Sequence, residues 1–388
     1  MINVAVIGTG VIANSHLEAY VKSFQGRCKV VALIDIYEDK AQQLKDKFQL
    51  DCEIVKDYHD VLDRDDLHLV SICTPPYTHA QIAVDMLHAG KHVLVEKPMA
   101  SSLEECDRML EAAEQSNRIL SVVGQNRFRD PIMKLKHTLD SGKVGKVVHA
   151  QVDSFWWRGH CYYDLWWRGT WEKEGGGCTL NHAVHHIDML QWMMGMPDKI
   201  QAVMSNTSHD NAEVEDLSVA ILSYGNGSLA QITSSVVHHG EEQQVVFQTE
   251  KARISAPWKV YASTSKENGF PIRNTALEEE LDAAYQAMES LTYTGHAGQI
   301  DNVLTAIENG SLDVLIDGRE GRKTLELITA IYEASTTGKS IQLPLTKDSS
   351  LFYSRDSLLA NAPHFYVKTS SVVSFAKNEI TLGSEYKK

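Results

Sequence analysis

The sequence predicts an α/β protein with a doubly wound parallel sheet at the N-terminus and a second α/β domain containing a large, mostly antiparallel open sheet. Short buried strands alternate with helices in the first part of the chain, whereas strands follow one another directly between residues 200 and 255. The 388 residues suffice for two domains of ordinary size. We expect these domains at 1–123 and 124–345, followed by a C-terminal extension, 346–388, whose role the sequence does not indicate.

The composition excludes several classes of protein. Hydrophobic residues make up 43% of the chain and charged residues 23%, as in globular proteins. The net charge of −14 repels polyanions, so we expect no nucleic-acid partner. The six cysteines form no Cys-x-x-Cys pair, which argues against a zinc knuckle or a disulfide framework. The apolar N-terminus is typical of a strand rather than a signal peptide, and no apolar run approaches the roughly 18 residues of a membrane span, so we expect a cytoplasmic protein.

A glycine-rich loop follows the first strand. Residues 4–7 form a continuous apolar run, and Gly8-Thr9-Gly10-Val11-Ile12-Ala13 follows at once, before a helix expected to reach Phe24. This Gly-x-Gly-x-x-Ala pattern between strand and helix is typical of a dinucleotide site. Gly8 permits the turn, Gly10 lets the backbone approach a pyrophosphate, and the small Ala13 lets the helix pack against the strand.

Asp35, which ends the second strand at residues 30–34, bears on the choice of cofactor. At this spacing an acidic residue hydrogen-bonds the adenosine ribose hydroxyls and repels a 2′-phosphate. We therefore expect NAD rather than NADP. The alternative is that Asp35 is a solvated residue at a strand end.

Two more loops are expected at the carboxyl ends of parallel strands, where such sheets bind ligands. Thr74-Pro75-Pro76-Tyr77-Thr78-His79 follows a strand at 67–73, and Glu96-Lys97-Pro98 follows a strand at 92–95. Proline restricts both loops, and Pro98 limits the conformations of Lys97. Lys97 is then a candidate site residue, the alternative being an ordinary surface lysine.

A glycine triplet, residues 175–177, begins a helix expected to run to Gly195. On one continuous helix Asn181, His185, Asp188 and Trp192 would share a face, which could hydrogen-bond a substrate hydroxyl. The alternative is a core helix with a buried, satisfied histidine.

Tryptophans are concentrated just before this helix: five of the seven lie within sixteen residues, at Trp156, Trp157, Trp166, Trp167 and Trp171. Indole faces stack on the apolar faces of pyranose rings, while arginine and tyrosine hydrogen-bond their hydroxyls. This favours a carbohydrate substrate. Alternatively, these aromatic residues pack a domain junction or an oligomer interface.

The second domain is expected to open with a strand at 147–155 and to continue with antiparallel strands, the Gly225-Asn226-Gly227 segment forming a hairpin turn. Helices at 296–308 and 319–336 should close the domain. A broad sheet needs its far face covered, so we expect a homodimer or homotetramer.

The motifs taken together resemble those of the glucose-fructose oxidoreductase, inositol dehydrogenase and MocA (Gfo/Idh/MocA) family. The resemblance rests on four motifs in the family's order over about residues 1–345: Gly8-Thr9-Gly10-x-x-Ala13, Thr74-Pro75-Pro76-x-x-His79, Glu96-Lys97-Pro98, and the glycine triplet followed by His185 and Asp188. It implies a nicotinamide-binding Rossmann domain and a second α/β domain whose open sheet often serves oligomerisation. Family members typically oxidise or reduce a secondary alcohol or ketone of a sugar or cyclitol.

Residue by residue, Lys97 resembles the family's catalytic lysine and His185 its catalytic histidine. Asn181 stands where many members have an aspartate, and an amide orients a hydroxyl but exchanges no proton. Some sugar-directed branches have asparagine here together with a Trp-Arg-Gly-Thr-Trp run, which this chain carries at 167–171.

The predicted site has three parts. The catalytic residues are Lys97, His185 and Asn181. Cofactor contacts are expected from Gly8, Thr9, Gly10, Val11, Ile12, Asp35, Thr74, Pro75, Pro76, His79, Glu96, Lys97 and Gln125. Substrate contacts are expected from Lys97, Trp157, Arg158, Tyr163, Trp167, Arg168, Asn181 and His185.

We expect no bound metal. His182 and His186 are four residues apart, and His238 and His239 are adjacent, but no third ligand lies at a suitable spacing. We interpret His182 and His186 as polar residues on the exposed side of the helix.

The sequence therefore predicts an NAD-dependent dehydrogenase acting on a secondary alcohol of a sugar, glycoside or cyclitol. One alternative keeps NAD bound and cleaves or epimerises a glycoside through a transient keto-sugar, without net redox change. A second alternative is a nucleotide-sensing regulator without catalysis. The presence of both Lys97 and His185 weighs against the regulator, which needs neither.

Overall fold

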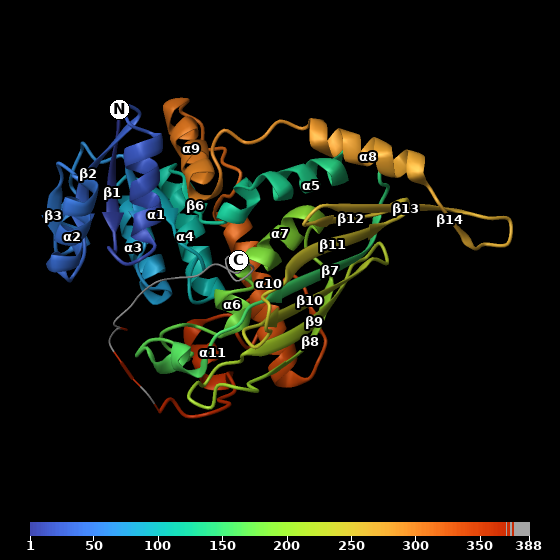
Figure 1. The fold of residues 1–388 in the computed structure, drawn as a ribbon. Coiled ribbons are helices and arrows are strands. Elements are labelled where there is room, and N and C mark those ends of the chain that lie inside the picture. Colours follow the sequence, from blue (N-terminus) through green and yellow to red (C-terminus); the bar gives the residue numbers. More distant parts are fainter. Residues whose placement is uncertain (370, 373–374, 376–388) are drawn as a thin grey trace. The chain divides into compact units, whose positions relative to one another are not determined.

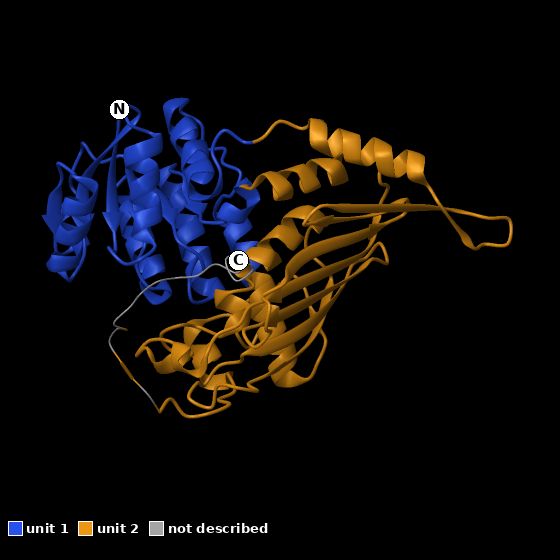
Figure 2. Ribbon diagram, in the orientation of Figure 1, with its two compact units in different colours: residues 1–128, 291–325 blue, residues 129–290, 326–388 orange. Residues whose placement is uncertain are grey.

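The computed structural model describes residues 1–369, 371–372 and 375. The chain forms two compact units, coloured separately in Figure 2. Unit 1 comprises Met1–Phe128 and Leu291–Leu325, and unit 2 comprises Arg129–Ser290 and Glu326–Lys388. In the part of the chain that the structure describes, no helix has the length and apolar character needed to cross a membrane.

Unit 1 contains the predicted parallel sheet (Figure 1). Its six strands lie in the order β3-β2-β1-β4-β5-β6, and every neighbouring pair is parallel. The strands are β1 (Ile2–Ile7), β2 (Cys28–Ile34), β3 (Glu53–Val55), β4 (Leu69–Ile72), β5 (His92–Val95) and β6 (Leu120–Val122). The connecting helices are α1 (Ala13–Glu18), which continues as a π-helical turn (Ala19–Ser23), then α2 (Glu38–Phe48), α3 (Pro76–His88) and α4 (Leu103–Ser116). The expected doubly wound sheet is thus confirmed.

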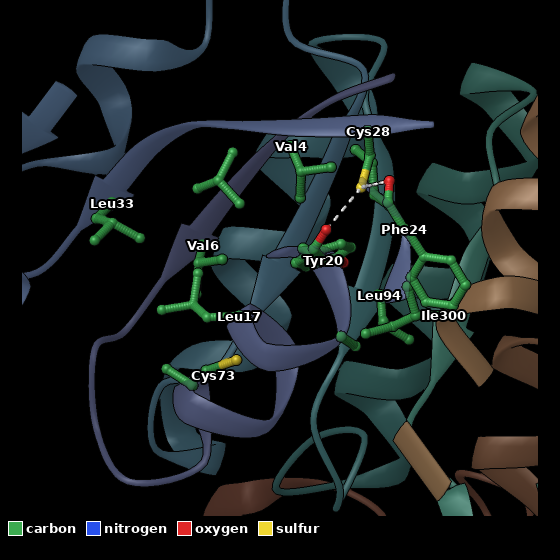
Figure 3. Packing of buried hydrophobic residues seen from close by; sticks show 14 of the residues in the cluster. Val4, Val6, Leu17, Tyr20, Phe24, Cys28, Leu33, Cys73, Leu94 and Ile300 are labelled. Carbon is green, nitrogen blue, oxygen red and sulfur yellow. Dashed lines mark hydrogen bonds between the residues drawn. The ribbon is translucent and has the colours of Figure 1, made fainter. Parts of the chain in front are cut away.

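Helix α9 (Gly295–Glu308) packs into the core of unit 1 (Figure 3). Ile300 is fully buried in one cluster with Val4 and Phe24, and Arg27 forms ion pairs with helix residues on the surface. From the sequence, this helix was expected in the second domain, with the boundary between the two domains at residue 123. The contacts give a different division, because the apolar face of α9 completes the N-terminal core from a distant part of the chain.

Unit 2 contains a nine-stranded sheet in the order β14-β13-β12-β11-β7-β10-β9-β8-β15 (Figure 1). β10 pairs with β7 in parallel, and all other neighbouring pairs are antiparallel, which confirms the mostly antiparallel sheet. The strands are β7 (Val147–Phe155), β8 (Lys199–Ser205), β9 (Leu217–Ser223), β10 (Leu229–Ser235), β11 (Gln243–Thr249), β12 (Ala252–Ala256), β13 (Lys259–Ser265), β14 (Pro271–Arg273) and β15 (Ile341–Gln342).

Two helices of unit 2 carry Asn181 and His185, two of the three predicted catalytic residues. α6 (Cys178–Asn181) contacts β9 and β10, and α7 (Val184–Met194) contacts β7. The remaining helices are α5 (Asp130–Asp140), α8 (Thr275–Ala287), α10 (Gly318–Thr337), which begins in unit 1, and α11 (Arg355–Asn361). The sheet of unit 2 therefore holds α6 and α7 against its central strands.

Candidate active site

The glycine loop after β1 has one glycine required by the fold and one that leaves space for a ligand. Gly8 has φ +90°, and a Cβ there would lie 2.7 Å from the backbone carbon of Cys73. Gly10 has no positive φ, and a Cβ there would meet no atom within 4 Å. Only glycine fits at the first position, whereas at the second the missing side chain leaves the backbone open to close approach by a ligand.

Asp35 is fixed against this loop. One carboxylate oxygen, Oδ2, accepts hydrogen bonds from the backbone N and Oγ1 of Thr9, both at 2.7 Å. The other oxygen, Oδ1, accepts from the backbone N of Tyr37 at 2.9 Å. A carboxylate held at the end of β2 beside the glycine loop is suited to accept bonds from ribose hydroxyls and disfavours an added phosphate.

His79 connects the two proline loops. It is fully buried on α3, and its ring nitrogens face the carbonyl oxygens of Thr74 at 2.8 Å and Pro98 at 2.9 Å. A side chain without exposed surface cannot touch a ligand directly. His79 therefore bears on the cofactor site by holding the Thr74 and Pro98 loops together.

Glu96 is the centre of a buried hydrogen-bond network beside Lys97. Its Oε1 lies 2.9 Å from Nε2 of His16 and 3.2 Å from Nε2 of His296, and its Oε2 accepts from the backbone N of Lys97 at 3.2 Å. Burial opposes ionisation, but the bonds from the two imidazoles hold the pKa of Glu96 well below its usual range. The ligand atoms of His16, Glu96 and His296 lie within 4.8 Å of one another, close enough for a cation, but here both imidazoles hydrogen-bond Glu96. The predicted site did not include either histidine, because 80 and 200 residues separate them from Glu96 in sequence.

Gln125 lies just beyond the carboxyl end of β6, among the expected cofactor residues. Its Oε1 and the Oδ1 of Asn126 are buried, and neither has a hydrogen-bond partner among the residues that the structure describes. Buried acceptors normally have donors. Together with the open backbone at Gly10 and the fixed Asp35, these acceptors fit a dinucleotide at the carboxyl ends of the strands.

In unit 2, the glycine triplet is required because two groups approach its backbone closely. A Cβ on Gly176 would lie 2.2 Å from the hydroxyl of Tyr332, and one on Gly177 would lie 1.9 Å from the carbonyl oxygen of Glu215. The Glu215 carboxylate accepts from the backbone N of Gly177 and of Thr179 and from the Tyr332 hydroxyl, each at 3.0 Å. Burial raises the pKa of Glu215 to about 7 despite these donors. Glu215 thus fixes the start of α6.

The expectation of one continuous helix from the triplet to Gly195 is wrong. The helix is interrupted after Asn181, because the backbone N of His182 and of Ala183 both bond the carbonyl of Cys178, at 3.0 and 2.9 Å. The bond from Ala183 to Cys178 spans five residues instead of the four of an α-helix, so Asn181 and His185 are not in register on one helix. Asn181 donates its amide to the carbonyls of Gly176 and Gly177 at 2.9 and 3.2 Å, so the triplet fixes it independently.

His185 is half-buried at the first turn of α7, whereas Asp188, one turn later, is 6% exposed. Trp192, the fourth residue of the expected face, is half-buried, with Nζ of Lys136 at 5.6 Å from its ring. Of the four, Asn181, His185 and Trp192 keep part of their surface exposed, whereas Asp188 is buried.

The interpretation of His182 and His186 as exposed residues is also wrong. They are 7% and 5% exposed, because the interrupted helix turns both towards the sheet side of unit 2. Nδ1 of His186 lies 3.0 Å from Oγ of Ser154, and burial lowers the pKa of His186 to about 4, so this ring is neutral near pH 7. Nε2 of His182 lies 3.4 Å from the hydroxyl of Tyr162.

The tryptophan-rich segment divides into an exposed part and a buried part. Trp157 and Trp166 are 43% and 39% exposed, and Trp167 is half-buried. Trp171 and Tyr163, by contrast, are each 1% exposed and belong to the interior. Trp171 and Tyr163 are therefore core residues, whereas Trp157, Trp166 and Trp167 keep exposed surface.

Two arginines of this segment are each paired with a buried carboxylate. Nη1 of Arg158 lies 2.7 Å from Glu241, and Nη1 of Arg168 lies 3.0 Å from Glu174. Both guanidinium groups also lie over the ring of Tyr162, whose hydroxyl accepts from Arg168. The predicted substrate contacts did not include Tyr162, Glu174 and Glu241. In the sequence, only the position of Tyr162 and Glu174 near the tryptophans pointed to a role at this surface.

Comparison with known proteins identifies the class of protein. Residues 2–123 match the family described as "Oxidoreductase family, NAD-binding Rossmann fold", and residues 132–255 match "GFO/IDH/MocA C-terminal domain". Together these regions cover more than half of the chain. The chain belongs to the Gfo/Idh/MocA family, and its N-terminal domain is an NAD-binding Rossmann domain.

Among curated relatives, inositol 2-dehydrogenase of Salmonella typhimurium is 31% identical over 192 residues, 49% of this chain and 53% of the relative. The match thus spans about half the length of this Salmonella inositol 2-dehydrogenase. The 2,7-anhydro-N-acetylneuraminate hydratase of Mediterraneibacter gnavus is 25% identical over 269 residues, 68% of this chain and 70% of that protein.

Among solved structures, the WlbA dehydrogenase of Bordetella pertussis, in complex with NADH and UDP-GlcNAcA, superposes with a TM-score of 0.75 at 27% identity. The match covers 89% of this chain and 98% of WlbA. A levoglucosan dehydrogenase in complex with NADH and levoglucosan also has a TM-score of 0.75, at 20% identity and with 89% and 100% coverage, which shows the shared fold.

We predict that alanine at the first glycine of this loop lowers stability, whereas alanine at the second weakens cofactor binding. Gly8→Ala should lower the free energy of unfolding by about 2–3 kcal/mol, because its Cβ meets the Cys73 backbone at a positive φ. Gly10→Ala should unfold like the wild type but bind NADH at least about tenfold more weakly, because the methyl occupies space for the pyrophosphate. Thermal unfolding and NADH fluorescence titration measure the two effects. Wild-type NADH affinity in Gly10→Ala would contradict this use of the loop.

We predict that Gly177→Ala destabilises unit 2 by about 3 kcal/mol, because its Cβ would lie 1.9 Å from the carbonyl oxygen of Glu215. Gly159→Ala is the matched control: both glycines have negative φ, and a Cβ on Gly159 meets Trp157 at an ordinary 3.6 Å. The control should change stability by less than about 1 kcal/mol. Denaturant unfolding measures the free energy of unfolding of both variants. Equal values for Gly177→Ala and Gly159→Ala would show that the approach of Glu215 does not constrain Gly177.

Proposed function

We propose that this protein is an NAD-dependent oxidoreductase that transfers a hydride between nicotinamide and a secondary alcohol of a neutral sugar, glycoside or cyclitol. The observation that carries the proposal is the anchoring of Lys97 to an ionised Glu96 in an NAD-binding domain. The presence of a half-buried His185 in the first turn of α7, shortly after the fixed Asn181, supports it. Relatives named as inositol 2-dehydrogenases are consistent with a neutral substrate. The WlbA complex with NADH and UDP-GlcNAcA is consistent with nicotinamide chemistry on a sugar, although that sugar is acidic.

In the proposed reaction, His185 takes the proton of the substrate hydroxyl, since an imidazole titrates near working pH. Lys97 donates a hydrogen bond to the same oxygen and stabilises the negative charge that develops as the proton leaves. Asn181, which the triplet carbonyls hold, orients substrate without exchanging a proton. NAD, when bound, supplies the acceptor for the hydride leaving the carbinol carbon.

The charge of the tryptophan-rich segment favours a neutral substrate. Arg158 and Arg168 are each neutralised by a carboxylate that is itself at least nine-tenths buried. An acidic sugar would have to compete with Glu241 and Glu174 for these cations, whereas hydroxyl groups can bond the paired arginines without separating them. Exposed indole faces at Trp157 and Trp166 offer stacking surface for a ring.

A second candidate is redox-neutral cleavage or epimerisation of a glycoside, in which NAD stays bound and the keto-sugar is transient. The similarity to a protein named as a hydratase favours keeping this candidate. The same Lys97 and His185 would start both reactions. The two differ in whether NADH accumulates.

We predict that a panel of neutral cyclitols, aldoses and glycosides contains a substrate whose oxidation produces NADH, detected by its absorbance. Lys97→Ala and His185→Ala should each lower kcat by about 10²–10⁴. NADH binding should stay intact in His185→Ala, since His185 is not among the expected cofactor contacts. Lys22→Ala and His88→Ala, both at exposed positions, are the controls and should retain activity.

Near-normal turnover in Lys97→Ala or His185→Ala would refute the assignment of roles. Product formation without NADH accumulation would favour the redox-neutral candidate. A uronic acid preferred over its neutral aldose would overturn the argument from the paired arginines.

We also propose that the chain forms a homodimer or homotetramer through the open face of the unit 2 sheet. Exposed apolar side chains lie on this face from β8 to β13, at Val203, Val219, Ile221, Leu229 and Tyr261. Val203 pairs directly with Val219, and Ile221 lies two residues further along β9, so their side chains point to one side. A second copy of the chain would bury this apolar surface.

We predict a particle of at least twice 43.3 kDa in light scattering at micromolar concentration. Ile221→Glu should shift it to the monomer, because burying an unpaired charge in the interface is unfavourable. Gln201→Glu, on the same face and opposite Ile221 in the sheet, tests whether any added charge suffices. A wild-type particle of 43.3 kDa would exclude this assembly.

A further inference from the structure

The C-terminal extension contains a segment, residues 363–372, that we call the clamp. Its described residues lie along the tryptophan-rich loop, residues 156–171, within unit 2. Val372 forms a parallel bridge with Leu165. The backbone N of Val372 donates to the carbonyl of Asp164 at 2.8 Å, and its carbonyl accepts from the backbone N of Trp166 at 3.0 Å. The clamp thus adds a short strand-like contact to a loop that has no sheet partner of its own there.

Lys368 provides a second, charge-assisted attachment. Its ammonium group donates to the carbonyl oxygens of Tyr163 and of Leu165, the latter at 3.0 Å. The half-buried ammonium is also attracted by carboxylates around the loop, Glu174 and Asp164 among them. One side chain of the clamp therefore satisfies two carbonyls at the centre of the loop.

A third attachment lies at the other end of the loop. The indole Nε1 of Trp171, which is 1% exposed, donates to the carbonyl of Pro363 at 2.8 Å. The backbone N of Phe365 donates to the carbonyl of Glu213 at 3.0 Å, and a carboxylate oxygen of Glu213 accepts from the backbone N of Trp171 at 3.3 Å. The clamp therefore holds the loop near both ends of its 163–171 stretch.

The held stretch contains one of the paired arginines and adjoins the tyrosine whose ring both arginines cover. Tyr162 directly precedes it, and Arg168 lies within it. The Tyr162 hydroxyl accepts from Arg168 and lies 3.4 Å from Nε2 of His182, which is three residues before His185. Apart from the 3-10 turn at His160–Asp164, this stretch has no regular secondary structure to fix it. Its shape consequently depends on what binds its backbone.

We infer that the clamp is a specificity-determining element that holds the tryptophan-rich loop in the shape that binds the sugar ring. The inference rests on the proposed sugar oxidoreductase function. Preorganisation by the clamp removes the entropic cost of ordering Tyr162, Trp167 and Arg168 when substrate binds. Its effect falls on substrate affinity, because its described hydrogen bonds go to the loop, at Tyr163, Asp164, Leu165, Trp166 and Trp171, and to Glu213.

The test compares Lys368→Met with Lys368→Arg in the full chain, with Lys347→Met as the control because Lys347 is an exposed lysine of the same extension. In Lys368→Met we expect KM for the neutral glycoside to rise about tenfold, with kcat and NADH affinity within twofold of wild type. Lys368→Arg should restore KM, since a guanidinium also donates to two carbonyls. A deletion of residues 363–388 should raise KM at least as much as Lys368→Met.

Hydrogen exchange separates this inference from the proposed function, because it needs no turnover. The Trp166 amide, which bonds Val372, should exchange faster in Lys368→Met than in wild type or Lys347→Met. Unchanged exchange in both Lys368→Met and the deletion would overturn the clamp, even if no substrate is found. Faster exchange with unchanged KM, a fall in kcat alone, or an equal KM rise in Lys347→Met would overturn its role in specificity.

Discussion

The geometry around His185 depends on the approach of Glu215 to the glycine triplet. A carbonyl at 1.9 Å from the position of a Cβ leaves no room for any side chain at Gly177, and the Glu215 carboxylate takes the first amides of α6. With the start of α6 fixed, the extra residue in the turn before α7 places Asn181 and His185 separately. Glycine is therefore required here because a residue with a Cβ could not pack against Glu215.

Unit 1 uses a second buried carboxylate in a comparable way. Glu96 accepts from His16 and His296 and from the backbone of Lys97, so side chains from three distant parts of the chain define one loop. A buried carboxylate is stable only when donors surround it. His79 adds the link to the Thr74 loop, so buried side chains hold the predicted cofactor loops in place.

The substrate surface proposed for unit 2 depends on neutralised charge and on the C-terminal segment. Glu241 and Glu174 neutralise Arg158 and Arg168 by forming ion pairs with them. In this proposal, substrate is therefore bound by aromatic faces and by oriented hydrogen-bonding groups rather than by net charge. Residues 363–372 attach to the loop that carries these groups through backbone bonds and Lys368. A sequence extension without internal periodicity can therefore shape a site by supplying partners to another irregular segment.

The sequence by itself determined the strand and helix pattern, the glycine loop with Asp35, and the family motifs around Lys97 and His185, because hydrophobic period and turn chemistry are local properties. Most predicted strands lie within two residues of their observed limits, for example Val147–Phe155. Only the tertiary structure decided that α9 joins the core of unit 1, that His182 and His186 are buried, and that His16 and His296 bind Glu96. These features depend on contacts between residues far apart in the chain, and no local pattern encodes which distant side chain completes a core or satisfies a buried carboxylate.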